Sequence, residues 1–351
     1  MTVLAPAPRP APAKVPLAPP LSRVDPVVRL PIVTLYPHSH CNCRCGMCDI
    51  WRARDRQEIT AAEIERWLPE WRALGVERVV LSGGEPLLHS HLWDLCALLR
   101  EAGIGITLLS TGLLLARDAE RLVRCCDDVI VSLDGPREVH DRIRNVPRAF
   151  DRLAEGIAAV RTADPGTALS GRCTVQRENC RTLRATVAAA RDIGLDRISF
   201  LAADVTSEAF NRPGGWDRER AASVALAPED LPLLAAEIEA IAEADFASGF
   251  IAENRDKLRS RLHHYFAALL GLGAFPAVEC NAPWVSSVIE SDGTVRPCFF
   301  QPPLGNAREA GSFAELLNSP SAVAWRRGLD VARDEVCRRC VCSLNLRESR
   351  G

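Results

Sequence analysis

The segment His40-Cys-Asn-Cys-Arg-Cys-Gly-Met-Cys-Asp-Ile-Trp51 places four of the chain's 14 cysteines within eight positions. The N-terminus has no positively charged region followed by an apolar one, so we expect no secretory signal and a cytoplasmic protein with reduced thiols. Reduced cysteines at this density are typical of metal ligation. Cys41, Cys45 and Cys48 have the spacing C-x3-C-x2-C, with three thiolates on one short loop. Three such ligands leave one iron of a [4Fe-4S] cluster open to a small molecule.

A zinc site is the alternative interpretation of this segment. Zinc prefers four Cys or His ligands in tetrahedral geometry, and Cys43, His38 or His40 could supply the fourth. The segment alone leaves both kinds of site open.

A second motif, Ser82-Gly83-Gly84-Glu85-Pro86, follows the short apolar run 78–81, which we expect to form a buried strand. Two glycines at a strand end let a ligand approach the backbone. The carboxylate of Glu85 can accept a hydrogen bond from an ammonium group. Taken alone, the motif also fits an ordinary turn.

Together, the two motifs resemble the signature of radical SAM enzymes. The resemblance implies that Cys41, Cys45 and Cys48 are the catalytic cluster ligands, and that the open iron of their [4Fe-4S] cluster chelates S-adenosylmethionine (SAM). The residues that it assigns to the methionyl amino group are Gly83, Gly84, Glu85 and Pro86. Those that it assigns to the ribose and carboxylate side of SAM are Ser110, Thr111, Gly112, Ser132 and Asn179. Each of the latter also fits a turn or a helix cap, and Asn179 is a good N-cap for the helix that follows it.

Alternating strand and helix patterns run from residue 32 to residue 201 and decide the fold class. The expected strands are 32–36, 78–81, 104–109, 129–133, 168–175 and 197–201, with five helices between them. Consecutive β-α units predict a parallel, right-handed α/β arrangement, a partial (β/α)6 TIM-like barrel. Barrel active sites lie at the carboxyl ends of the strands, where the cysteine segment is expected. A capping box at Thr60 and Glu63 begins the first helix, and Pro69 predicts a kink in it.

We expect four parts in the chain. Residues 1–30 are rich in proline and alanine and are expected to be a disordered leader. Residues 31–201 form the barrel, and residues 202–276 form a helical linker that contributes to the substrate pocket. Residues 277–346 form a small hairpin-plus-helix domain. Within the barrel, Asp134 and Arg144 resemble a recurrent stretch of radical SAM enzymes, but they also fit a structural ion pair.

A second set of cysteines lies near the C-terminus. A predicted hairpin over 284–298, turning at 291–293, brings Cys280 and Cys298 toward one another, and Cys337-x2-Cys340 supplies a second pair. This region resembles the SPASM/twitch auxiliary-cluster region, and its cysteine count favours one auxiliary [4Fe-4S] cluster, as in the shorter twitch form. The ligands expected are Cys280, Cys298, Cys337 and Cys340, although Cys342 could replace Cys340. A structural zinc site is the alternative.

Composition narrows the function classes. The net charge is −2 and no long basic run occurs, so we do not expect a nucleic-acid substrate. No uninterrupted apolar stretch approaches about 18 residues, so no membrane span is expected.

The radical SAM resemblance implies a reaction class. A reductant such as flavodoxin or ferredoxin reduces the cluster, SAM is cleaved, and the 5′-deoxyadenosyl radical abstracts a hydrogen atom from the substrate. The first expectation is an oxidoreductase or maturase that oxidises or cross-links a peptide or protein residue. The second is a small-molecule dehydrogenase acting on a sugar or cofactor precursor. A non-catalytic zinc-binding interaction protein is the alternative of another class.

Overall fold

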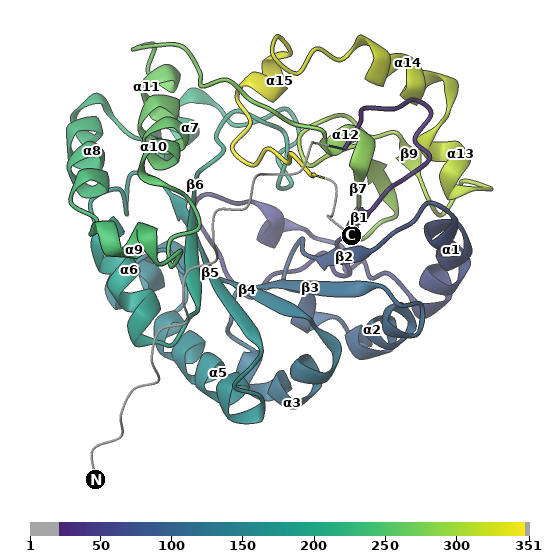
Figure 1. Ribbon diagram of the computed structural model, residues 1–351, viewed down its shortest axis with the longest axis horizontal. Coiled ribbons are helices and arrows are strands. Elements are labelled where there is room, and N and C mark those ends of the chain that lie inside the picture. Colours follow the sequence, from purple (N-terminus) through teal and green to yellow (C-terminus); the bar gives the residue numbers. More distant parts are fainter. Residues whose placement is uncertain (1–20, 348–351) are drawn as a thin grey trace.

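The computed structural model describes residues 21–347, and its centre is a curved sheet with helices on its outer face (Figure 1). The six strands of the barrel are parallel to one another and neighbour each other in chain order. They are β1 (Ile32–Leu35), β2 (Arg78–Leu81), β3 (Gly105–Ser110), β4 (Asp128–Ser132), β5 (Ala168–Val175) and β6 (Arg197–Ala202). The predicted partial TIM-like barrel is therefore confirmed, with strand ends within one residue of the expected ones.

Helices connect the strands and pack on the outer face of the sheet (Figure 1). They are α1 (Ala61–Ala73), α2 (Leu92–Glu101), α3 (Leu115–Cys125), α4 (Arg137–Arg144), α5 (Ala149–Ala163) and α6 (Leu183–Asp192), with the short helices η1 (Ile50–Arg52) and η2 (Pro86–Leu88). The capping box of Thr60 and Glu63 is present, and α1 continues through Pro69. Helix α4 was not predicted from the sequence; it has only eight residues, and most of them are charged.

The sheet does not end at β1. Strand β7 (Ser286–Ile289) pairs with β1 in parallel, and β8 (Thr294–Arg296) and β9 (Gly305–Asn306) extend the sheet to nine strands. The predicted hairpin with its turn at 291–293 is confirmed, but its first strand begins later than expected because 282–285 form the helix α12 (Ala282–Val285). The helices α13 (Phe313–Leu317), α14 (Pro320–Gly328) and α15 (Glu335–Arg338) complete this region.

The segment between β6 and α12 contains more breaks than the two helices predicted for it. Its helices are α7 (Arg218–Val224), η3 (Pro228–Asp230), α8 (Leu231–Glu239), α9 (Glu243–Ala247), α10 (Arg255–Leu258), the π-helix η4 (Arg259–His264) and α11 (Tyr265–Leu269). Part of it covers the free edge of β6, where Ile251 bridges to Ile198 and the Glu253 carboxylate accepts from the amide of Phe200 at 3.2 Å. Within residues 21–347, no helix has the length and apolar character needed to cross a membrane.

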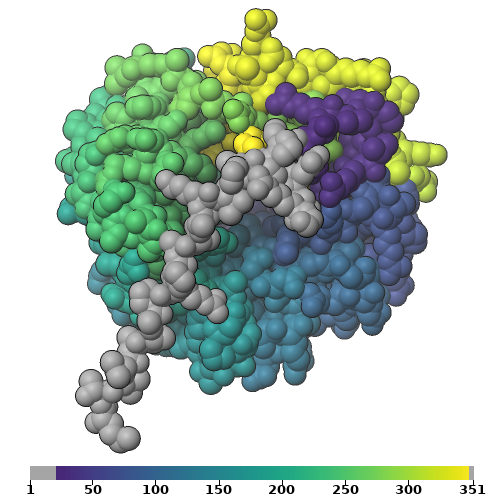
Figure 2. Space-filling model, viewed as in Figure 1, coloured from purple at the N-terminus to yellow at the C-terminus, as the bar shows by residue number. Residues whose placement is uncertain are grey.

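Residues 21–30 are packed against the C-terminal region, so the prediction of a disordered leader is wrong for them; its first 20 residues lie outside the described part. Asp25 accepts a hydrogen bond from the guanidinium of Arg326 at 2.5 Å and another from the indole of Trp284 at 3.2 Å. Leu30 is 1% exposed. In Figure 2 the purple N-terminal part lies beside the yellow C-terminal part. Two ends of the chain that are far apart in sequence are therefore joined by a buried ion pair.

We predict that Arg326→Met destabilises the protein by about 3–5 kcal/mol, because it leaves the buried carboxylate of Asp25 without its charged partner. Denaturant unfolding of the purified protein measures this free energy. Arg327→Met is the matched control, since Arg327 is exposed on the same helix and should change stability little. Equal stabilities of the two variants would contradict the prediction.

Candidate active site

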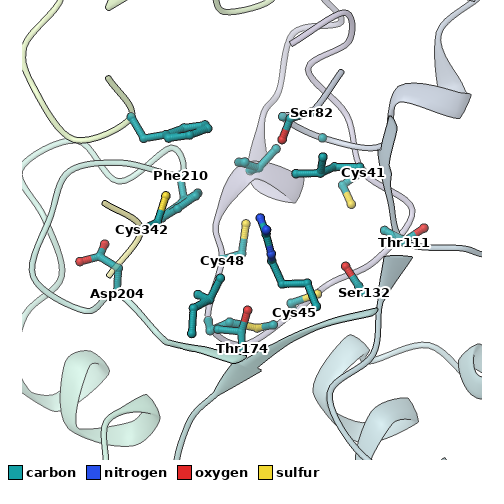
Figure 3. Close-up of a pocket in the computed structure, with 18 of the residues that line it drawn as sticks. Cys41, Cys45, Cys48, Ser82, Thr111, Ser132, Thr174, Asp204, Phe210 and Cys342 are labelled. Carbon is teal, nitrogen blue, oxygen red and sulfur yellow. The ribbon is translucent and has the colours of Figure 1, made fainter. Parts of the chain in front are cut away.

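A cavity of about 260 Å³ lies at the carboxyl ends of the barrel strands. Figure 3 shows Cys41, Cys45 and Cys48 facing the same space as Thr111 and Ser132. All three cysteines of the C-x3-C-x2-C pattern line this cavity, as do Gly83 and Gly84. The structure therefore brings together the two motifs that carried the sequence prediction.

Cys43 differs from the other three cysteines of the segment. It is 1% exposed and does not line the cavity. Hydrogen bonding of its thiol to Cys41 and Cys45, together with burial, raises the pKa of Cys43 far above its ordinary value. The hydrogen bond from Cys43 and the guanidinium of Arg144 lower the pKa of Cys45 to about 7 despite burial. Cys43 thus has the environment of a protonated thiol.

The Gly-Gly turn after β2 lies directly against the cysteine segment. A Cβ added to Gly84 would lie 2.0 Å from the carbonyl oxygen of His40, and one added to Gly83 would lie 2.5 Å from the ring of Tyr36. The amide of Glu85 donates to the same His40 oxygen at 2.8 Å. These glycines are required for close packing with the cysteine segment, and their backbone also forms part of the cavity wall.

The side chain of Glu85 does not line the cavity, and its predicted contact with SAM stays a prediction. Glu85 is 0% exposed and is not among the cavity-lining residues. Its carboxylate accepts from the amide and hydroxyl of Thr111, both at 2.7 Å, from the hydroxyl of Ser110 at 2.9 Å and from the amide of Leu87 at 3.1 Å. Burial raises the pKa of Glu85, and the bonds from Thr111 oppose that shift. The carboxylate fixes the end of β3 beside the turn after β2.

The other residues predicted to bind SAM fall into two groups. Ser110, Thr111 and Ser132 line the cavity. Pro86, Gly112 and Asn179 do not. Gly112 has a φ of 85° and would place a Cβ 2.3 Å from Leu153, so packing against α5 requires it.

Asn179 is completely buried, and its side chain joins two strand ends. Its amide nitrogen donates to the carbonyls of Asp134 and Thr174 at 2.8 and 3.1 Å, and its oxygen accepts from the amide of Gln176. The N-cap of α6 is Thr182, so the helix-cap alternative for Asn179 is wrong, while its predicted role in SAM binding stays a prediction.

Asp134 and Arg144 form the ion pair that the sequence left open. Their charged atoms lie 2.5 Å apart, and both side chains are almost completely buried. Arg144 also lies 3.6 Å from the sulfur of Cys45 and lines the cavity. The pair therefore combines a structural contact with a positive charge beside one thiol of the cysteine segment.

Several cavity residues were not singled out from the sequence. They are Arg172, Asp204, Phe210, Arg212, Phe299 and Phe300. Three of them belong to the segment after β6, which we expected to contribute to the pocket without naming residues. The two phenylalanines directly follow Cys298, and this adjacency was the available signal.

The C-terminal cysteines divide between two cavities. Cys280, Cys298, Cys337 and Cys340 line a small cavity of about 20 Å³, whereas Cys342 lines the large one (Figure 3). Burial raises the pKa of Cys298 to about 12. The arrangement places the four predicted auxiliary ligands together and separates Cys342 from them, which favours Cys340 over Cys342.

The thiol sets have the chemistry that iron-sulfur clusters require. Cys41, Cys45 and Cys48 line the first cavity together with Cys342, four further thiols line the small one, and thiolates are the usual cluster ligands. Across residues 21–347, no group of three or more His, Cys, Asp or Glu side chains is placed to hold a single metal ion.

Comparison with known families gives the same division of the chain. Residues 35–200 match the radical SAM superfamily, and residues 280–341 match SPASM, an iron-sulfur cluster-binding domain. A PqqA peptide cyclase of Ruegeria pomeroyi is 30% identical over 281 residues, which cover 77% of this chain and 68% of that protein. This chain belongs to the radical SAM superfamily. Membership implies a SAM-binding [4Fe-4S] cluster and, through the SPASM match, an auxiliary cluster.

Other relatives match a smaller share of the chain. An AdoMet-dependent heme synthase of Methanosarcina barkeri is 29% identical over 159 residues, which are 44% of this chain and 45% of that protein. An Fe-coproporphyrin III synthase of the same organism is 27% identical over 175 residues, 48% of this chain and 43% of that protein. The chain thus spans less than half the length of these two curated relatives.

Solved structures share the fold at low sequence identity. SuiB of Streptococcus suis bound to the precursor peptide SuiA has a TM-score of 0.62 and 16% identity, covering 92% of this chain and 76% of that one. The enzyme anSMEcpe with bound AdoMet and Cp18Cys peptide has a TM-score of 0.63 and 20% identity, covering 90% and 93%. These similarities confirm the radical SAM architecture from the barrel through the auxiliary region.

We predict that alanine at Cys41, Cys45 or Cys48 abolishes 5′-deoxyadenosine formation from SAM under reductant, whereas Cys43→Ala retains most of it. Only the first three thiols face the cavity. The measurement is product quantification by chromatography with anaerobically reconstituted protein. An inactive Cys43 variant beside an active Cys41 variant would refute this ligand set.

We predict that Glu85→Ala lowers the stability of the protein by about 3 kcal/mol, because it leaves several buried donors unsatisfied. Glu77→Ala is the control, since Glu77 is an exposed carboxylate that directly precedes β2, the strand that Glu85 follows. Unfolding of both variants and their SAM affinities should be measured together. Unchanged stability with weakened SAM binding would instead support a direct contact between this carboxylate and SAM.

Proposed function

We propose that this radical SAM enzyme oxidises or cross-links a residue within a peptide or protein substrate. The observation that carries the proposal is a second cavity of about 450 Å³ that adjoins the first. The two cavities share six lining residues: Tyr36, Ile50, Gly84, Phe210, Arg212 and Phe299. A small molecule needs only the inner cavity, whereas an extended chain needs a continuous path to the surface.

The outer cavity has the character of an entrance for a polar chain. Its lining includes residues of the stretch 53–57, which follows the cysteine segment, the loop 208–213 and the hairpin turn at 290–292. Its charged lining residues are Arg54, Asp55, Glu208, Arg212, Glu290, Asp292 and Arg296. Near the junction, by contrast, the inner cavity is bounded by the rings of Phe210, Phe299 and Phe300. Charged flanking residues can therefore remain in the outer cavity while the reacting residue occupies the aromatic one.

Relatives support a peptide substrate. The Ruegeria pomeroyi relative, which matches most of this chain, is a PqqA peptide cyclase, and both solved neighbours described above were crystallised with peptides. The heme and coproporphyrin synthases match a smaller share of this chain, 44% and 48%.

We assign roles to the chain's own residues as follows. Cys41, Cys45 and Cys48 would hold the SAM-binding cluster, which would supply the electron for cleavage of SAM to methionine and a hydrogen-abstracting 5′-deoxyadenosyl radical. The backbone of Gly83 and Gly84 and a set of hydroxyls form the SAM wall. The hydroxyls are those of Ser110, Thr111 and Ser132. The aromatic rings at the junction exclude water from the reacting carbon.

Cys280, Cys298, Cys337 and Cys340 are assigned to the auxiliary cluster. Four thiols give every iron a protein ligand, so the site has no open position for substrate and is suited to electron transfer or to structure. Phe300 lines both the inner cavity and the small one. The two cavities are therefore neighbours, which supports electron transfer from the substrate to the auxiliary site.

The division of the chain follows from these roles. We assign residues 31–201 to SAM chemistry, 202–276 to the substrate pocket and 277–346 to the auxiliary cluster. An external protein reductant of the flavodoxin or ferredoxin type is expected to supply the first electron.

A direct test incubates the reconstituted enzyme with SAM, reductant and short precursor peptides encoded beside its gene. We expect a peptide product that has lost two hydrogen atoms, measured by mass spectrometry, with one 5′-deoxyadenosine formed per turnover. Turnover of a porphyrin or sugar precursor with no peptide product would favour the small-molecule alternative.

We predict that Cys298→Ala still cleaves SAM but yields no oxidised product, because the electron from the substrate has no acceptor. Quantification of 5′-deoxyadenosine and of modified peptide in the same reaction measures both steps. Cys96→Ala is a matched control, since Cys96 is a buried cysteine of α2 outside both cavities. Normal product from the Cys298 variant would rule out the electron-acceptor role.

A further inference from the structure

The segment 204–220, which follows β6, holds the cysteine segment through several hydrogen bonds. It lies between the two family matches, outside both. Four of its side chains donate to the stretch 46–49. These are Arg212 to the carbonyl of Met47 at 2.5 Å, Arg220 to the carbonyl of Gly46 at 2.6 Å, Trp216 to the carboxylate of Asp49 at 2.6 Å and Asn211 to the carbonyl of Asp49 at 3.1 Å. The amide of Asp49 in turn donates to the carbonyl of Phe210 at 3.2 Å.

Arg212 is the most enclosed of these donors. Its side chain is 1% exposed and pairs with the buried carboxylate of Asp204 at 3.0 Å. The guanidinium lies 3.7 Å from the ring centroid of Trp216, a distance for a cation–π contact. Its Nε has no hydrogen-bond partner among the described residues. Asp204 and Trp216 thus hold the guanidinium in place, where it lines the inner cavity together with Cys48.

The backbone beside Arg212 is strained. Phe210 and Asn211 both have a φ of 62°, and a bulky residue such as phenylalanine rarely adopts this left-handed conformation. Such conformations cost of order 1–3 kcal/mol each and persist where surrounding contacts enforce them. Here the strained residues are those that exchange hydrogen bonds with Asp49. The strained backbone therefore lowers the stability locally, where the segment 204–220 is hydrogen-bonded to the cysteine segment.

We propose that Arg212 is a positioning residue for the SAM-binding cluster. It fixes the Met47 carbonyl between two of the cluster cysteines and holds a positive charge beside the Cys48 sulfur. The inference rests on the assignment of Cys41, Cys45 and Cys48 as ligands, and it does not depend on the substrate.

Two consequences follow for the cluster. Hydrogen bonds and positive charge near the ligand sulfurs make a cluster easier to reduce. An ordered ligand loop also slows the escape of iron. Loss of Arg212 should therefore shift the midpoint potential to more negative values and accelerate iron release.

The test measures iron release to a chelator and the midpoint potential by EPR-monitored titration of anaerobic full-length protein. For Arg212→Met we expect iron release to be about 10-fold faster, the lower end of the effect of losing an outer-shell partner, and the potential to be more negative. Arg212→Lys should restore the potential, because the charge remains, but not slow iron release, because an ammonium cannot reproduce the planar, stacked geometry. Arg218→Met is the control, since Arg218 is exposed on the same segment and should behave like the wild type.

The triple variant of Cys41, Cys45 and Cys48 to alanine gives the auxiliary signal alone, which is subtracted from every trace. If that variant contains as much iron as the wild type, the assignment of Cys41, Cys45 and Cys48 as cluster ligands is wrong. The proposal for Arg212 is then wrong with it. If Arg212→Met does not fold, iron release and the midpoint potential are measured on Arg220→Met and Trp216→Phe instead, since each removes one hydrogen bond to the cysteine segment. Wild-type iron release and potential in the variants that fold would overturn the proposal.

Discussion

The close approach of Gly84 to the carbonyl of His40 is the contact on which the site depends. A side chain at position 84 would collide with that oxygen, and the next amide along the chain donates to it. Parallel pairing of β1 with β2 brings two strand ends together, but only a residue without a Cβ turns that proximity into contact. The cysteine segment is thereby fixed at one side, while Arg144 and the segment 204–220 reach it from other parts of the chain.

Local sequence patterns predicted most of the fold. Strand and helix positions followed from the periodicity of the apolar residues and, for α1, from the capping box at Thr60. The pairing of β7 with β1 could not be predicted in this way, because it joins residues about 250 positions apart and leaves no local signal. The same holds for Asp25 and Arg326, whose ion pair joins residues 21–30 to the C-terminal region although they were expected to belong to a disordered leader.

The cysteines of the candidate site were predicted well, because the spacing of thiols alone indicates their chemistry. Residues whose role depends on the direction of the side chain were predicted poorly. Cysteine spacing identified the thiols that face the cavities. Glu85 and Asn179 were placed in the right region, but their side chains turn toward the strand ends and bind backbone there. Arg212 was missed because an arginine followed by Pro-Gly-Gly reads as an exposed loop, and its burial depends on Trp216 and Asp204 together.

The continuous sheet also limits how the protein can be divided. Because β7 occupies the edge of β1, a fragment cut before residue 286 would expose the backbone donors and acceptors of an apolar central strand. Bare strand edges of this kind recruit other chains and aggregate. The SAM-binding barrel and the auxiliary region thus share one continuous sheet. Replacing the C-terminal part with that of a relative requires a first hairpin strand that pairs with β1 in the same register. Any recombinant of such proteins must preserve the pairing of β7 with β1.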